Sequence, residues 1–554
     1  MNKILHKFFI LFAGILFLSA SACSDVDDPV IATLEPAQLV SSTPENGAEG
    51  VPIGDVTIVL TYDQNVFCPT AGHSRITLGD ATITSVAAKL SNVTIKATGL
   101  QKGEIYNLVV PEGVVQGPTY VSAQPVSISF TAKDDPKITA TLCTPNPTAQ
   151  ALKLYQYLVS TYKEKVISGT MANVNWNVEG ADAVYALTGK YPAMNTFDYV
   201  HLPFSPSSWI DYSDITPVKD WWNAGGIVSA MWHWNVPVSA RLWTGETAMP
   251  DDWSGNVQLT DDAFVQSFAI AKVGDIIRVA IKDLAAGAQG SIKGSNWGEI
   301  ASGYEYFDIS GSYYEMPVTG EILEKLQSSG MILSGHDYTV TGVYLIPANS
   351  QGDYAFYKEN TYFDAAKATV SGTWENEIFT ADLAKIATSL KQLQSEGIAV
   401  IWRPFHEAAG GWFWWGKDAE SCKKLWIAMF DYFQAQGVNN LIWVWTSEPN
   451  DADWYPGDAY VDIIGRDLYN KDTAASNSAY WTEFERYGHK IVALTESGTL
   501  GLLSEQWNAG ARWAWFMPWY GTNDNGENHA TDAWWQDAMS QDYVITRDQL
   551  PNLK

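Results

Sequence analysis

Two glutamates of this sequence lie in settings that suit acid–base chemistry on a sugar. Glu407 lies in the stretch IWRPFHEAAGGWFWWG, residues 401–416, which carries four tryptophans around the pair His406–Glu407. Glu496 lies in ALTESG, residues 493–498. Cleavage of a glycosidic bond needs one carboxylic acid that protonates the leaving oxygen and a second carboxylate that attacks the anomeric carbon or activates water. The aromatic rings beside Glu407 also offer flat faces on which the C–H groups of a sugar can pack.

Strand-like and helix-like segments alternate over residues 140–554 and would position these glutamates. Eight short apolar segments, each of the kind that forms a buried strand, occur at 166–170, 191–199, 225–234, 397–407, 439–446, 461–469, 489–497 and 512–519. Helical patterns such as LAKIATSLKQLQSEG separate them. This alternation indicates an α/β fold, and eight strands indicate a (β/α)8 TIM barrel. A doubly wound sheet is the alternative, but polar residues gathered at the strand ends favour the barrel.

In such a barrel, the residues at the carboxyl ends of the strands face the active site. The expected strand ends supply polar and aromatic side chains, namely His233, Trp234, His406, Glu407, Asp467, Tyr469, Glu496, Trp519 and Tyr520. Glu407 and Glu496 end strands four and seven, on opposite sides of a narrow barrel mouth. This placement suits the separation of about 5–5.5 Å between the carboxyl groups of a retaining glycosidase. Taken alone, Glu407 could instead form an ion pair with Arg403.

Two other regions have β character, and residues 36–133 show the period-two alternation that is typical of a β-sandwich. Residues 36–133 resemble bacterial Ig-like domains, because they open with PENGAEGV and close with SFT. Residues 240–350 lie between barrel strands three and four, and a structureless loop of that length would be implausible in a compact domain. We therefore expect a β-sandwich inserted after strand three. Its tryptophans indicate either a carbohydrate-binding module or a structural insert, and those considered are Trp243, Trp253 and Trp297.

The N-terminus has the features of a secretory signal. Lys3 and Lys7 precede an apolar run that is too short to span a membrane, and small residues follow it up to Cys23. Small residues directly before a cysteine resemble a bacterial lipoprotein signal. We therefore expect residues 1–22 to be removed, Cys23 to carry the lipid, and residues 23–35 to tether a cell-envelope lipoprotein at the outer membrane or cell surface. An ordinary signal peptide with a chance cysteine is the alternative.

The composition restricts the possible partners. The formal net charge is −28, so the surface repels phosphate backbones and anionic headgroups. Nucleic acid is therefore not expected as a partner, and a membrane is expected only through the lipid anchor. The 25 tryptophans and 27 tyrosines favour a neutral polysaccharide as the partner. The protein is expected to be a monomer. Motifs for zinc, for dinucleotides and for the phosphate-binding loop are absent from the sequence, so no metal or cofactor is expected.

Four stretches together resemble glycoside hydrolase family 26, namely RPFHEAAGGWFWWG, NLIWVW, WYPGDAYVDIIGRDLY and ALTESG. The resemblance covers about 148–554 apart from the insert. It implies a retaining endo-acting enzyme of the β-1,4-mannanase type, which cleaves mannan, galactomannan or glucomannan. Matching by motif makes Glu407 the general acid/base and Glu496 the nucleophile.

The resemblance also assigns roles around these two glutamates. It places His406 in the hydrogen-bonding network of the acid/base, and it makes Tyr469 the residue that steadies the nucleophile. The residues that it brings to the sugar are His233, Trp412, Asp467 and Trp519. Arg466 departs from the pattern, because an aromatic residue is commoner there, so the exact substrate stays open.

Two rivals to a mannanase remain at this point. A β-1,3-1,4-glucanase of the same family is the nearer one, because mannose and glucose differ only at the 2-hydroxyl. A non-catalytic surface polysaccharide-binding protein is the other. Such a binding protein would have no need to keep both Glu407 and Glu496.

Overall fold

The structure of the protein is a computed structural model that describes residues 35–173, 176–207 and 210–554. The predicted signal, with Cys23, and most of the predicted tether therefore lie outside the described residues. The chain divides into two compact units, one up to Asp135 and one from Pro136 to Lys554, and each is described by itself. Among the described residues, none of the helices is long and apolar enough to cross a bilayer.

The larger unit is built on a closed parallel barrel. Its eight strands follow one another around the barrel and close by pairing of β9 with β10: β9 (Val166–Met171), β10 (Met194–Asp198), β11 (Ile227–Met231), β22 (Val400–Arg403), β23 (Leu441–Ser447), β24 (Ile463–Lys471), β25 (Ile491–Leu500) and β26 (Trp515–Pro518). Each strand overlaps one of the eight predicted segments, and β9, β23, β24 and β25 extend one to three residues beyond theirs; the (β/α)8 barrel is confirmed. A short strand, β27 (Val544–Ile545), adds to the edge of β9.

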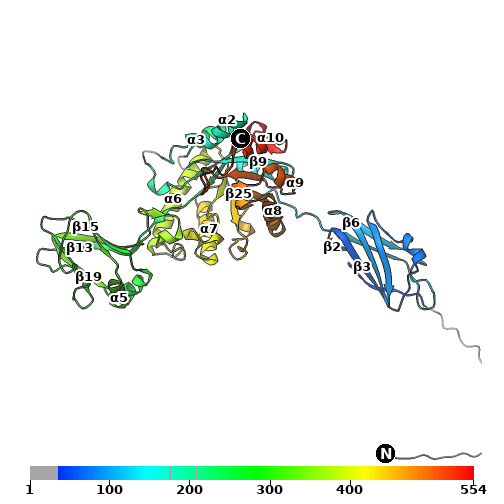
Figure 1. Ribbon diagram of the computed structural model, residues 1–554, viewed down its shortest axis with the longest axis horizontal. Helices are drawn as coiled ribbons and strands as arrows, with labels where there is room; N and C mark the ends of the chain where they lie inside the picture. Colours follow the sequence, from blue (N-terminus) through cyan, green and yellow to red (C-terminus); the bar gives the residue numbers. More distant parts are fainter. Residues whose placement is uncertain (1–34, 174–175, 208–209) are drawn as a thin grey trace, which may run out of the picture. The chain divides into compact units, whose positions relative to one another are not determined.

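Helices surround this barrel and cover its strands (Figure 1). Their bounds are α1 (Ala149–Thr161), α2 (Glu179–Thr188), α3 (Thr216–Asn223), α6 (Trp374–Ser395), α7 (Ala419–Ala435), α8 (Thr473–Tyr487), α9 (Leu503–Asn508) and α10 (Asp532–Ser540). Five of these helices begin where a side-chain oxygen accepts a backbone N–H of the first turn, which satisfies a donor that the helix itself leaves unpaired. The capping residues are Thr148, Thr373, Asp418, Asp472 and Thr531.

The smaller unit is a β-sandwich, as predicted for an Ig-like domain. One sheet has the order β1 (Leu39–Thr43), β3 (Gly54–Tyr62), β6 (Asn92–Leu100) and β5 (Thr82–Lys89), and the other has the order β2 (Ala48–Val51), β8 (Val126–Ala132), β7 (Ile105–Val110) and β4 (Thr77–Leu78). Alternate residues of β3 are buried, because successive side chains of a strand point to opposite faces. Those buried residues are Val56, Ile58, Leu60 and Tyr62.

The region between β11 and β22 forms two further four-stranded sheets with a hydrophobic core of their own. The first contains β13 (Ala240–Met249), β20 (Tyr338–Ile346), β15 (Ile276–Lys282) and β18 (Tyr313–Pro317); the second contains β14 (Asn256–Leu259), β19 (Met331–His336), β16 (Gln289–Gly294) and β17 (Phe307–Asp308). Two helices accompany them, α4 (Asp262–Ser267) and α5 (Gly320–Ser329). The fold prediction of an inserted β-sandwich is confirmed.

The three tryptophans considered for this insert differ in exposure. Trp297 is 49% exposed. Trp253 is half-buried, with its ring 4.9 Å from that of His336 and 5.5 Å from that of Tyr306. Trp243 is half-buried against the core of the insert. Of the three, Trp297 offers the freest ring to a ligand.

Candidate active site

A sharp turn after β22 places Glu407 at the barrel mouth. Phe405 and Glu407 both have left-handed backbone angles, with φ of 47° and 51°, which non-glycine residues adopt uncommonly. Trp415 fastens this turn by donating its Nε1–H to the backbone oxygen of His406 at 2.9 Å. Trp412 donates its Nε1–H to Oε2 of Glu407 at 3.0 Å. The aromatic stretch after Glu407 thus fixes both the backbone and the carboxyl group, and such unusual backbone is common at functional sites.

Glu496 is buried within β25 and is held from two sides. The hydroxyl of Tyr469, on β24, donates to its Oε2 at 2.8 Å. The guanidinium of Arg403, at the end of β22, donates to its Oε1. Arg403 also donates to Oδ2 of Asp467 at 2.9 Å, and Thr495 donates to Oδ1 of the same carboxylate at 2.6 Å. The predicted contact of Tyr469 with Glu496 is therefore present. Asp467, which was predicted to bind the sugar, forms an ion pair with Arg403.

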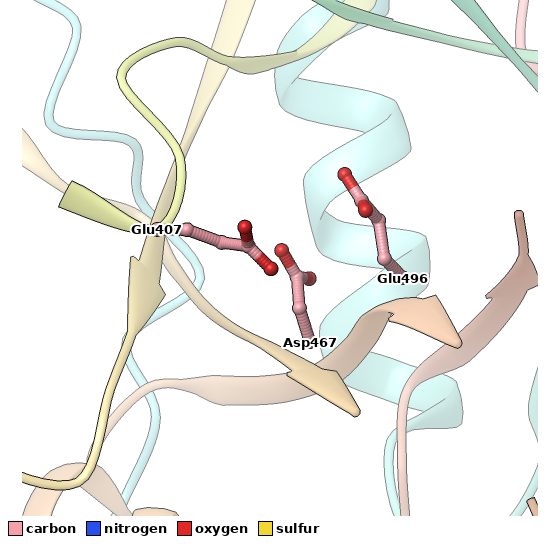
Figure 2. A group of neighbouring side chains, drawn as sticks. All are labelled: Glu407, Asp467 and Glu496. Carbon is pink, nitrogen blue, oxygen red and sulfur yellow. The ribbon is translucent and has the colours of Figure 1, made fainter. Parts of the chain in front are cut away.

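The carboxyl groups of Glu407, Asp467 and Glu496 gather above the strand ends (Figure 2), and one oxygen of each lies within 4.8 Å of the others. Burial raises the pKa of Glu407, and the charges of Asp467 and Glu496 raise it further. Burial also raises the pKa of Glu496, but Arg403 beside it acts in the opposite direction. The two glutamates therefore differ: Glu407 is favoured as an acid, and Glu496 has the partners of a carboxylate.

The ion pair between Glu407 and Arg403 that the sequence left open does not appear among the ion pairs of Arg403 in the described residues. Arg403 forms ion pairs with Asp467 and Glu496. Three carboxylate oxygens this close could also hold a metal ion. The guanidinium, however, already supplies positive charge to two of the three carboxylates, which leaves them fewer free lone pairs for a cation.

Two histidines connect the acid turn to strand two. Nδ1 of His233 lies 2.6 Å from Oδ2 of Asp198, and its backbone N–H donates to Oδ1 at 3.0 Å. Nε2 of His233 lies 3.0 Å from Nε2 of His406. Burial lowers the pKa of His406, as do the neighbouring His233 and Arg403. The lowered pKa favours the neutral form of His406, whose Nε2 can either donate to or accept from Nε2 of His233.

The aromatic residues divide into packing and exposed groups. Trp414 and Trp415 are buried, whereas Trp412 is 41% exposed at the mouth. Trp519, at the end of β26, is half-buried, with its ring 5.5 Å from that of His233. The structure thus brings all of the predicted sugar-site residues to one end of the barrel, around the glutamate pair.

Three contributors were missed or misjudged from the sequence. Asp198 ends strand two, and its position was a usable signal. Arg466, noted in the sequence only as a departure from the family pattern, is largely buried in an ion pair with Glu448, with Nη1 and Oε2 2.8 Å apart. It also donates to the backbone oxygen of Ser447 at 2.6 Å. Glu448 follows strand five, and its charge adds to the raised pKa of Glu407.

Known proteins share both parts of this architecture. Residues 143–262 and 333–549, more than half of the chain, match the family described as Glycosyl hydrolase family 26, and residues 33–132 match the Bacterial Ig-like domain. The GH26 domain of an endo-beta-mannanase/endo-beta-glucanase from Prevotella bryantii has a solved structure that is 34% identical. It aligns with a TM-score of 0.52 over 74% of this chain and 99% of that domain.

Curated relatives named mannan endo-1,4-beta-mannosidase match parts of this chain, and so does one named Endoglucanase H. Mannan endo-1,4-beta-mannosidase B from Piromyces sp is 36% identical over 231 residues, which are 41% of this chain and 39% of that protein. Mannan endo-1,4-beta-mannosidase from Thermothelomyces thermophilus is 28% identical over 425 residues, 75% of this chain and 64% of that protein. The chain thus spans less than two thirds of the length of these relatives. The matched family model and the barrel agree, and this chain belongs to glycosyl hydrolase family 26.

Proposed function

We propose that the chain is a retaining endo-β-1,4-mannanase that uses Glu407 as acid/base and Glu496 as nucleophile. The single observation that supports this most is the glutamate pair: carboxyl oxygens of the two residues lie within 4.8 Å of each other, and the surroundings raise the pKa of Glu407 to about 10 but that of Glu496 only to about 6. The names of the relatives supply the substrate class, a β-1,4-linked mannan. A neutral chain of this kind suits a surface with a net charge of −28, because it carries no charge to be repelled.

The first step of the proposed reaction forms a covalent intermediate. A carboxylate oxygen of Glu496 attacks the anomeric carbon while the bond from that carbon to the leaving oxygen breaks. Glu407 gives its proton to the leaving oxygen, so the departing sugar is a neutral alcohol. Tyr469 and Arg403 hold Glu496 in place, since each donates a hydrogen bond to one of its oxygens.

The second step releases the sugar with its original configuration. Glu407 is now a carboxylate and takes a proton from a water molecule, whose oxygen attacks the anomeric carbon from the face that the leaving group vacated. The bond to Glu496 breaks, and both glutamates return to their starting states. In this scheme Trp412 and Trp519 stack on sugar rings, and His233 and Asp467 lie within reach of hydroxyls, with His406 orienting His233.

A comparison of substrates tests this proposal. We expect the purified protein to cleave mannan, galactomannan and glucomannan, and to leave xylan intact. NMR of the first product should show the β-anomer, since two displacements retain the configuration. Preference for barley β-1,3-1,4-glucan would replace the mannanase by the related glucanase. Binding without cleavage of any of these polymers would replace it by a surface binding protein.

We also propose that the protein is a monomeric cell-envelope lipoprotein anchored through Cys23. The sequence before Cys23 supports this, and the acidic stretch after it would be the tether of an Ig-like spacer. Stable anchoring needs two or more acyl chains, because a single chain binds membranes only marginally.

Replacing Cys23 with alanine is expected to release the protein from membranes into the soluble fraction. Fractionation of the producing cells and immunoblotting would measure this partition, with Cys68→Ala as the matched control, since Cys68 lies in the Ig-like unit. Unchanged membrane association of the Cys23 variant would contradict the lipid anchor.

A further inference from the structure

The chain that returns from the inserted sandwich runs along the rim of the active site. After β21 (Tyr354–Ala355) pairs with β12 (Val236–Pro237), the next residues pair with the stretch that follows the acid turn. The N–H of Trp414 donates to the oxygen of Phe356 at 3.0 Å, and the N–H of Lys358 donates to the oxygen of Trp412 at 2.8 Å. The return segment is therefore fastened to the same stretch that holds Glu407.

Two aromatic rings of this return segment lie in line with the histidines. The Phe356 ring is 5.2 Å from that of His233. The Tyr357 ring stacks on Phe413, with ring centroids 5.7 Å apart and planes 17° apart. Phe413 is buried, and its ring lies 4.9 Å from that of His406. Tyr357 is thus separated from the active-site histidines by a single buried ring.

About half of the Tyr357 side chain, 49%, is exposed, although the rings of Phe356 and Phe413 both contact it. Trp412, which donates to Glu407, is 41% exposed and precedes Phe413, the residue that pairs with Tyr357. Tyr357 stacks on the buried ring of Phe413, and backbone hydrogen bonds fix its neighbours Phe356 and Lys358. These contacts hold Tyr357 in one orientation. An exposed ring that is already oriented binds a flat partner at a small cost in conformational entropy.

We propose that Tyr357 forms a sugar-binding subsite on the leaving-group side of the scissile bond, an inference that rests on the proposed function. Glu407 must face the leaving oxygen to protonate it. The rings that border Glu407 through the 412–414 pairing therefore border the departing part of the polysaccharide. Tyr357 stacks on a sugar unit of this departing part. The inserted sandwich therefore contributes to substrate binding through the segment that returns from it to the barrel.

The test compares Tyr357→Ala with two matched variants. Tyr357→Phe keeps the ring and removes the hydroxyl. Tyr185→Ala removes a ring of similar exposure, 46%, that is also stacked on another ring, Tyr191, but lies in the C-terminal half of α2. Each variant is assayed on two substrates. Mannohexaose reaches past the scissile bond on both sides, whereas 2,4-dinitrophenyl β-mannobioside carries no sugar on the leaving-group side.

Tyr357→Ala should lower kcat/KM on mannohexaose by about 5- to 150-fold, the range found when a stacking ring is removed at nucleic-acid sites. The aryl mannobioside should be cleaved at an unchanged rate, and transfer of the glycosyl group to added mannobiose should fall, because the acceptor occupies the same subsite. Tyr357→Phe and Tyr185→Ala should keep the unchanged protein's values on both substrates.

Other results would overturn the subsite. Equal losses on both substrates would place Tyr357 on the other side of the bond or make it a support of the Glu407 turn, and a lowered Tm would identify the latter. No loss on mannohexaose would remove Tyr357 from the substrate path. The proposed function fails separately: it fails if the unchanged protein cleaves neither substrate, and the subsite then fails with it. Trp297→Ala, in the same assays, should leave kcat/KM on both substrates unchanged. A loss on mannohexaose as large as that of Tyr357→Ala would assign the effect to the insert and not to Tyr357.

Discussion

Replacing Glu496 with alanine is expected to abolish cleavage of every glycoside, whatever its leaving group. The change removes the atom that attacks the anomeric carbon, so a better leaving group cannot compensate. The loss in kcat should be on the order of 10⁶-fold, as when the nucleophile of another covalent catalyst is removed. Steady-state rates on mannan and on 2,4-dinitrophenyl β-mannobioside would measure it. External azide should attack the vacated face and give a glycosyl azide of inverted configuration.

The structure also predicts a cost in stability for this variant. Arg403 is buried and donates to Glu496 and Asp467, so alanine leaves part of a buried guanidinium without its partner. A loss of about 1–3 kcal/mol in the free energy of unfolding is expected. Glu496→Gln keeps an oxygen for Arg403 and should be more stable than the alanine variant, yet equally inactive. Retained activity in either variant would remove Glu496 from the nucleophile's role.

The matched control is Glu375→Gln. Glu375 is as buried as Glu496, but it belongs to the first turn of α6 and lies outside the carboxylate cluster. Its conversion to glutamine should leave turnover close to that of the unchanged protein. A general effect of changing a buried carboxyl group would instead lower the activity of both variants.

The barrel could be predicted because parallel strands are buried on both faces and form continuous apolar runs. All five residues of β11 are buried, for example, and four of them are apolar, with Ser229 the exception. The ends of such strands then locate the site, which is how His233, Glu407 and Glu496 came together. The Ig-like sandwich followed from the period-two alternation, since a strand with one buried face repeats every second residue.

The finer arrangement of the site could not be predicted because it depends on choices that sequence leaves open. Arg403 is within reach of three carboxylates, and only the geometry selects Asp467 and Glu496 over Glu407. The left-handed turn at Phe405 and Glu407 has no glycine to signal it. Trp412 and Trp414 differ in exposure because the intervening backbone pairs with the return segment of the insert, a contact between distant residues.

Replacing Glu407 with alanine is expected to separate the two steps of the reaction. The nucleophile remains, so 2,4-dinitrophenyl β-mannobioside, whose leaving group needs no proton, should still form the covalent intermediate. That intermediate should accumulate, because water has lost its base, and intact-protein mass spectrometry would detect it. Azide should restore turnover with retained configuration. Mannan has a poor leaving group, and its cleavage should fall by roughly 10²- to 10⁴-fold, the size of a general acid–base contribution.

The pH profile gives an independent measure of the same residue. Burial and two neighbouring carboxylates raise the pKa of Glu407, so the folded protein holds this proton to higher pH than a free glutamate does. In the unchanged protein kcat/KM on mannan should therefore be maintained through neutral pH and, on the alkaline side, fall only as the pH rises through the raised pKa of Glu407. On the acid side it should fall as Glu496, whose pKa is raised to about 6, becomes protonated. For Glu407→Ala on the dinitrophenyl substrate, this alkaline fall should disappear, because the group that titrates is gone. If instead the Glu407 variant gave the inverted azide product and the Glu496 variant accumulated the intermediate, the two roles would have to be exchanged.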